Sequence, residues 1–145
     1  QGDKQAALAD YNEAIRLNPN YAEAYSNRGV VRSDQGDKQA ALADYNEAIR
    51  LNPNYAEAYS NRGIVRSDQG DKQAALADYN EAIRLNPNYA DAYYNRALVR
   101  KEQRDIQGTI NDFQKASELY QQEGNADLYR DAQNAIRELQ RELEV

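Results

Sequence analysis

Three asparagines recur at a spacing of 34 residues: Asn27, Asn61 and Asn95. Each side-chain amide carries an acceptor oxygen and donor hydrogens, the combination needed to hold an extended peptide backbone. Three such amides in one row could therefore bind a polypeptide segment. The alternative is that each amide bonds a neighbouring helix or faces water, because duplication copies a residue whether or not it is used.

A second repeated set consists of charged residues. Arg28 and Arg32 stand four residues apart, and like charges at this spacing on a helix repel each other by roughly 0.2–0.5 kcal/mol. A carboxylate must offset that repulsion, and Asp44 is the plausible partner. The same set recurs as Arg62, Arg66 and Asp78, and as Arg96, Arg100 and Asp112. We predict Arg–Asp pairs that fix the stacking of the repeats, with an arginine row that binds phosphate or carboxylate as the alternative.

The composition argues against catalysis and against a metal or cofactor. The chain has no His and no Cys, which removes imidazole and thiolate, the ligands and nucleophilic partners of most metal and hydrolytic sites. The remaining acids and tyrosines are copied from unit to unit, whereas a catalytic site is usually unique in its chain. We therefore expect no enzyme and no cofactor. The absence of Cys leaves the cellular compartment open.

Charge and hydropathy restrict the classes of partner that the chain is expected to bind. Eighteen basic residues against 24 acidic ones give a net charge of −6, with no basic cluster, which argues against nucleic acid. No apolar run approaches the roughly 20 residues that span a bilayer, so we expect no membrane segment. The chain has no Met, even at residue 1, which indicates a piece of a longer protein.

The repeated residues belong to a 34-residue unit. Its first two copies, Gln1–Asp34 and Gln35–Asp68, differ only in having Val30 against Ile64, and a third copy covers Gln69–Glu102. The third copy departs from the second at Asp91, Tyr94, Ala97, Leu98, Lys101 and Glu102. A period of this length is typical of helical repeat arrays. Copies this similar indicate either recent tandem duplication or assembly from one module.

Turn residues divide each unit into two helices. The Asn-Pro-Asn cluster around Pro53 ends one helix and can cap the next. Gly36 can take a left-handed position after a helix, and Asp37 can cap the helix that follows. We expect helices from about Lys38 to Leu51 and from about Tyr55 to Asp68.

Gly63 lies in the middle of an expected helix, where glycine costs roughly 1 kcal/mol relative to alanine. Its position there favours close packing against another helix.

These positions resemble the tetratricopeptide repeat (TPR) family. The matching residues are Tyr25, Gly29, Ala41, Ala48 and Pro53, repeated as Tyr59, Gly63, Ala75, Ala82 and Pro87. The resemblance covers residues 1–102 closely and continues more loosely to about Gln122. It implies an all-α, right-handed superhelix (α-solenoid) of antiparallel helix pairs, a non-catalytic protein interaction module in which the first helix of each pair lines a concave groove.

The family pattern divides the chain into five parts. Residues 1–18 form an unpaired second helix of a truncated repeat, residues 20–53 and 54–87 are repeats, 88–122 is a diverged repeat, and 124–145 is a C-terminal capping helix. The last helix carries an apolar stripe of Leu128, Ala132, Ala135, Ile136, Leu139 and Leu143. The stripe predicts a capping helix that packs its apolar side on the array and turns its polar side to water. Pairing with a helix of another chain is the alternative.

Mapping the family geometry assigns the peptide-binding groove. Its predicted residues are Glu23, Asn27, Val30, Asp34, Glu57, Asn61, Ile64, Asp68, Asp91, Tyr94, Asn95, Leu98, Lys101 and Glu102. Ser26 and Ser60 also map to it, and Tyr94 replaces them in the third copy as the best aromatic contact. This set contains several carboxylates and only one lysine, Lys101, so the groove should be negatively charged. A basic or neutral protein segment is therefore the expected partner. A solvated charged face is the alternative.

The groove lacks the residues that related domains use for acidic peptides. TPR domains that hold the acidic C-termini of heat-shock chaperones use Lys, Asn and Arg as a carboxylate clamp. The matching residues here are Ser26, Val30, Asn61, Asp91 and Asn95, of which only Asn61 fits. We therefore expect acidic tails to bind poorly.

A second functional hypothesis is self-association. The unpaired first helix could dock on a neighbouring chain or exchange with its equivalent. Open-ended docking would produce filaments, and reciprocal exchange would produce closed dimers.

Overall fold

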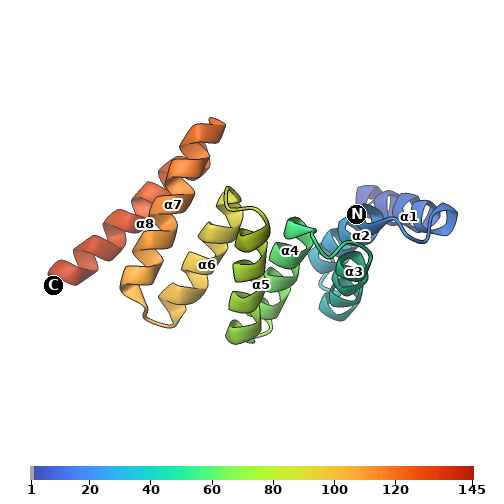
Figure 1. Cartoon of the computed structure of the whole chain (residues 1–145), viewed down its shortest axis with the longest axis horizontal. Helices are drawn as coiled ribbons and strands as arrows, with labels where there is room; N and C mark the ends of the chain where they lie inside the picture. The colour runs from blue at the N-terminus through green and yellow to red at the C-terminus, as the bar shows by residue number, and fades with distance from the viewer. Residues whose placement is uncertain (1) are drawn as a thin grey trace.

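The computed structural model describes residues 2–145, and this part of the chain contains eight α-helices and no strand. The helices are α1 (Gly2–Leu17), α2 (Ala22–Asp34), α3 (Lys38–Leu51), α4 (Ala56–Asp68), α5 (Lys72–Leu85), α6 (Ala90–Glu102), α7 (Ile106–Glu123) and α8 (Ala126–Glu144). They stack into an elongated array from α1 at one end to α8 at the other (Figure 1). The predicted all-α solenoid is confirmed. No helix within residues 2–145 has the length and apolar character needed to cross a bilayer.

The predicted Gly-Asp turn is confirmed. Gly36 and Gly70 both have a φ of 86°, the left-handed conformation that glycine accommodates without steric cost. Asp37 then caps α3, because its side chain accepts a hydrogen bond from the backbone N–H of Ala40 at 3.2 Å.

The Asn-Pro-Asn cluster ends α3 at Leu51, as predicted, but the prediction that it can cap the next helix is wrong. The Asn52 side chain accepts from the backbone N–H of Asn54 at 3.1 Å, so its hydrogen bond closes the turn itself. Tyr55 precedes α4 and makes no side-chain cap.

Arg104 stands where the earlier turns have glycine, and its φ is 63°. A left-handed conformation costs a non-glycine residue roughly 1–2 kcal/mol, and Arg104 is exposed and makes no ion pair within residues 2–145. We expect Arg104→Gly to raise the free energy of unfolding by about 1 kcal/mol, as measured by urea denaturation. The reverse change, Gly70→Arg, should lower it by a similar amount. An Arg104→Gly protein no more stable than the parent would contradict this prediction.

Close packing of each helix pair depends on a small residue opposite an aromatic ring. A Cβ added to Gly63 would lie 2.7 Å from Cε1 of Tyr79, and Gly29 has the same relation to Tyr45. Both tyrosines are 2% exposed. The packing reason predicted for the mid-helix glycine is confirmed. In the third pair, Ala97 clusters with Phe113.

Buried ion pairs fix the stacking of the helices, as predicted. Arg28 donates through Nε and Nη2 to the two carboxylate oxygens of Asp44 at 3.0 and 2.7 Å, and Arg32 donates to the same carboxylate at 3.1 Å. The remaining Nη1 of Arg28 donates to Asn12 Oδ1 at 2.9 Å, a partner that the sequence analysis missed. The set repeats as Arg62, Arg66, Asp78 and Asn46, and as Arg96, Arg100, Asp112 and Asn80. Arg28, Arg62 and Arg96 therefore each connect three consecutive helices.

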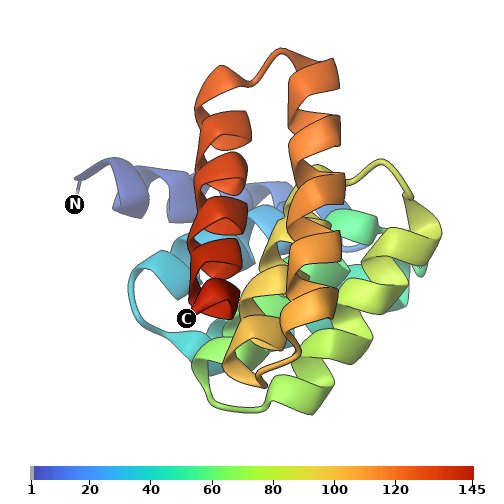
Figure 2. The same ribbon diagram turned by 90° about the vertical axis from the view of Figure 1, so that its left-hand side faces the viewer.

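The two ends of the array differ. At the C-terminal end, Ala132, Ile136 and Leu139 of α8 are buried, and the last two share a cluster with Ala97 and Phe113 from α6 and α7. Figure 2 shows α7 and α8 side by side at this end. Leu143 departs from the predicted stripe, because it is 62% exposed. At the other end, α1 contains no buried residue.

Candidate functional site

The first helices of the three pairs, α2, α4 and α6, contact one another in series. They carry the fourteen residues first assigned to the groove, and none of these fourteen is buried. We call this surface the first-helix face. The helical period places Glu23, Asn27, Val30 and Asp34 along one side of α2, and the repeats place their equivalents on α4 and α6.

The asparagine row on this face is open to a ligand. Asn27 is exposed, and Asn61 and Asn95 are half-buried. No side-chain hydrogen bond within residues 2–145 uses any of these amides, and none of their polar atoms is buried without a partner. By contrast, Asn12 and its equivalents are held by arginines. The row therefore retains both its acceptors and its donors.

Apolar side chains run beside the amides. Val30, Ile64 and Leu98 are 38%, 38% and 42% exposed. A pocket of about 120 Å³ between α2 and α4 is lined by Val30, Ser33, Asp34, Tyr45, Asn61, Ile64 and Val65. Four of the predicted groove residues therefore meet at one concavity, where a small apolar side chain would lie within reach of an amide.

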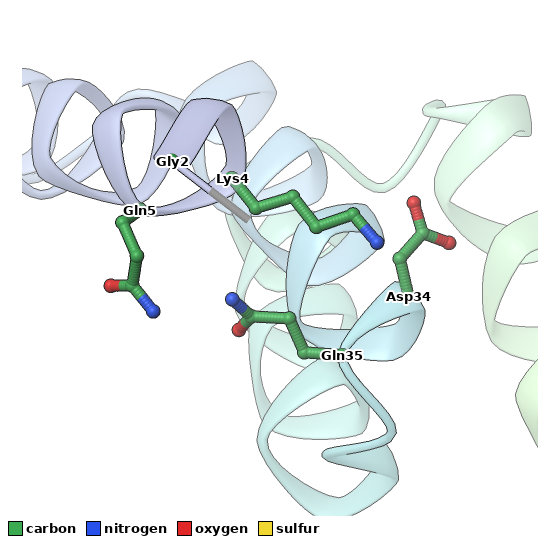
Figure 3. Close-up of a pocket in the computed structure, with 5 residues that line it drawn as sticks. All are labelled: Gly2, Lys4, Gln5, Asp34 and Gln35. Carbon is green, nitrogen blue, oxygen red and sulfur yellow. The ribbon is translucent and has the colours of Figure 1, made fainter.

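Lysines that the sequence analysis missed lie next to the predicted acids. Lys38 Nζ is 3.5 Å from Asp68, and Lys72 Nζ is 2.8 Å from Glu102. Figure 3 shows the Lys4 side chain extending toward Asp34, the equivalent position in the first pair. These lysines come from second helices, which the groove assignment left out. The ion pairs of Lys38 and Lys72 reduce the negative charge at the C-terminal ends of α4 and α6.

The remaining acidic character concentrates near Glu23 and Glu57. Both residues are exposed and lie in the first turn of their helices. A carboxylate in that position also stabilises the helix through its dipole. The two side chains thus have a structural function as well as the ability to attract a cation.

Asp91 and Tyr94 contribute to packing in the third pair. Asp91 accepts a hydrogen bond from the Tyr120 hydroxyl, and burial together with this bond raises the pKa of Tyr120. The Tyr94 ring meets Phe113 edge-on at 5.2 Å between centroids, and burial raises the pKa of Tyr94. Tyr94 remains a predicted contact, but part of its ring belongs to the core.

The profile of the family described as "TPR repeat" matches residues 1–36, 32–70 and 66–103. The chain belongs to the TPR family. No curated protein sequence matches it significantly.

Solved structures agree with this TPR assignment. A crystal structure of MamA has a TM-score of 0.71 and 25% identity, and the match covers 99% of this chain and 92% of that one. The first TPR of Spaghetti (RPAP3), bound to the HSP90 peptide SRMEEVD, has a TM-score of 0.75, 23% identity and coverage of 86% and 94%. The TPR2B domain of yeast Sti1, in a pHsp70 complex, has a TM-score of 0.77, 23% identity and coverage of 83% and 97%. The last two likenesses concern the fold alone.

Two serines that were also mapped to the groove of this TPR array do not reach it. Ser26 is 2% exposed and Ser60 is 1% exposed, so neither side chain is available to a peptide. The phenols of Tyr55 and Tyr89, which precede the following first helices, lie next to these hydroxyls. Burial raises the pKa of Tyr89 to about 12. The signal was present in the sequence, since a tyrosine precedes every first helix.

Proposed function

We propose that this TPR array is a non-catalytic scaffold that binds an extended, basic or neutral polypeptide segment along the first-helix face. The observation that carries the proposal is the row of three accessible amides that make no side-chain hydrogen bond within residues 2–145. In this arrangement the amides bind the backbone of the segment, and the track of Val30, Ile64 and Leu98 takes its apolar side chains.

Two structural neighbours support a peptide partner. The RPAP3 domain is bound to the peptide SRMEEVD, and the Sti1 domain is in a complex with pHsp70. The side chains that this chain exposes on its first-helix face differ from those of a carboxylate clamp. Glu23 and Glu57 are exposed acids, and of the five residues that match the carboxylate clamp only Asn61 fits. Acidic peptides are therefore disfavoured, and Lys or Arg in the segment is attracted to Glu23 and Glu57.

At the third pair, Leu98 and the exposed edge of Tyr94 provide further apolar contact in this proposal. Lys101 lies at the far end of α6, where it favours an acidic group at one end of an otherwise basic or neutral segment.

The test compares peptides that differ only in charge. Fluorescein-labelled SRMEEVD and its charge-reversed counterpart SRMKKVK are titrated with the full chain, and affinity is measured by fluorescence anisotropy. We expect the basic peptide to bind at least tenfold more tightly at low salt, with the difference shrinking as salt screens the charges.

Variants then locate the binding surface. Asn61→Ala should weaken binding of the basic peptide by about threefold to tenfold, the effect of losing one or two neutral hydrogen bonds. Gln73→Ala, an exposed change on α5, is the matched control and should leave the affinity unchanged. Equal binding of the two peptides, or an unchanged affinity in an Asn27→Ala, Asn61→Ala, Asn95→Ala triple variant, would remove the support for this function.

A further inference from the structure

A buried tyrosine reaches the pocket between α2 and α4, where four of the predicted groove residues meet. Tyr45 is 2% exposed, and a Cβ added to Gly29 would lie 3.1 Å from its Cζ, the ring atom that carries the hydroxyl. The phenol makes no hydrogen bond with any residue from 2 to 145, and no sealed side-chain polar atom in this part of the chain lacks a partner. The hydroxyl must therefore meet solvent, which it does at the pocket that Tyr45 lines.

Two further oxygen-bearing side chains line the same pocket of about 120 Å³. Asp34 of α2 is exposed and makes no ion pair within residues 2–145, although Lys4 extends toward it (Figure 3). Burial, together with the nearby Asp34 carboxylate, raises the pKa of Tyr45, so the phenol stays protonated. Asn61 of α4 contributes an amide that no side-chain hydrogen bond within residues 2–145 uses. Three helices thus each supply one hydrogen-bonding oxygen to one small pocket.

The rest of the pocket wall is apolar or already has its charge balanced. Val30 and Ile64 come from the two neighbouring first helices. The Ser33 hydroxyl accepts a hydrogen bond from Lys38 Nζ at 3.3 Å, and the same ammonium lies 3.5 Å from Asp68. Lys38 therefore has its own counter-charge outside the pocket. A ligand side chain that suits this pocket is apolar along its length and positively charged at its tip.

We propose that this pocket binds a lysine side chain of the segment held on the first-helix face. The inference rests on the proposed peptide-binding function and names a residue that the segment carries. The methylene stem lies between Val30 and Ile64, and the ammonium donates to Asp34, Tyr45 and Asn61. An ammonium has three donors and no acceptor, so it matches three separate oxygens from three helices.

Lysine matches these groups better than other side chains do. The guanidinium of arginine is a planar fork that suits the two oxygens of one carboxylate, whereas an ammonium is a compact charge with three rotatable donors. An apolar side chain would leave the Tyr45 hydroxyl and the Asp34 carboxylate without partners in a partly desolvated place. An acidic side chain would be repelled by Asp34.

The other two pairs of helices lack this combination. Tyr79 is as buried as Tyr45, but the acid that corresponds to Asp34 is Asp68, which is paired with Lys38. In the third pair, Phe113 stands at the position of Tyr45 and has no hydroxyl. Of these three positions, only the first joins a phenol to a carboxylate that has no ion pair within residues 2–145. The third pair also indicates that the fold accommodates phenylalanine at this position.

The test compares SRMKKVK with SRMRRVR, a peptide of equal charge that contains no lysine. Both peptides are labelled with fluorescein and titrated with the full chain, and affinity is measured by fluorescence anisotropy. We expect the lysine peptide to bind about tenfold more tightly, and Tyr45→Phe to remove this advantage, because one hydrogen bond to a charged group is lost. The affinity of the arginine peptide should change by less than about twofold in the same variant. Tyr79→Phe is the matched control and should leave both affinities unchanged.

A second variant tests the carboxylate of the pocket. Asp34→Asn should weaken binding of the lysine peptide by about tenfold, because the ammonium loses its counter-charge. Glu118→Gln removes the same charge from an exposed position on α7 and should change the affinity by less than about twofold. Circular dichroism verifies that each variant is folded as the parent is.

The outcomes separate this inference from the proposed function. Equal binding of the two peptides, or a Tyr45→Phe chain that still prefers the lysine peptide, would overturn the lysine pocket and leave the proposed function in place. Equal weakening of both peptides by Tyr45→Phe would also overturn it, because the phenol would then act through the shape of the groove. No saturable binding of either peptide would overturn both.

Discussion

Asp78→Ala should lower the free energy of unfolding by about 3–5 kcal/mol, the range for breaking a buried charge pair on one side. The Asp78 side chain is only 4% exposed, and it accepts two hydrogen bonds from Arg62 and one from Arg66. Its removal leaves two positive charges four residues apart on α4, without a counter-charge in a poorly solvated place. Urea denaturation followed by circular dichroism measures the change without adding salt.

The control for this prediction is an ion pair of similar composition on the surface. Glu81→Ala breaks the contact with Arg84, which is 66% exposed, and exposed pairs contribute about 1 kcal/mol or less. A third variant, Arg62→Leu with Arg66→Leu and Asp78→Leu, should be more stable than Asp78→Ala, because no buried charge is left unpaired. Equal losses in Asp78→Ala and Glu81→Ala would show that burial of the pair does not matter.

Gly63→Ala should also destabilise the array, by about 1–3 kcal/mol, although alanine is the better helix former by about 1 kcal/mol. The new methyl group would lie 2.7 Å from the Tyr79 ring, closer than carbon atoms can approach, so α4 and α5 must separate or the ring must move. The measurement is again the urea midpoint and slope.

The third repeat contains the natural comparison for this substitution, since Ala97 faces Phe113 there. We expect Gly63→Ala combined with Tyr79→Phe to recover part of the loss, because a ring without a hydroxyl can shift more freely. A Gly63→Ala protein as stable as the parent would mean that helix propensity outweighs the steric contact.

Much of this fold could be predicted because its determinants are local or exactly repeated. Gly36 and Asp37 specify a turn through their own backbone and side-chain chemistry. The Arg28–Asp44 pair could be inferred because two like charges on one helix need a counter-charge and the repeat offers one at constant spacing. The third partner, Asn12, could not, since a neutral amide gives no comparable signal.

The candidate site could be predicted less completely, because it depends on which residues of neighbouring repeats meet. Lys38 comes from a second helix but reaches the end of the next first helix, so a list restricted to first helices overstated the negative charge. Ser26 lies on the expected side of α2, but the tyrosine before α4 covers it. Tyr94 looks like an exposed anchor in the sequence, yet Phe113 and Tyr120 of α7 take up part of its ring.

The arginine bridges also explain how such a chain can change in length. Arg62 bonds Asn46 of its own 34-residue unit and Asp78 of the following one, so each unit supplies the donor and the acceptor that its neighbours require. Inserting or deleting a whole unit between identical copies therefore closes the network again without any new contact. An unequal exchange between repeats of the gene would produce a longer or shorter protein that is already stable, and its reach along a bound segment could evolve in steps of one unit.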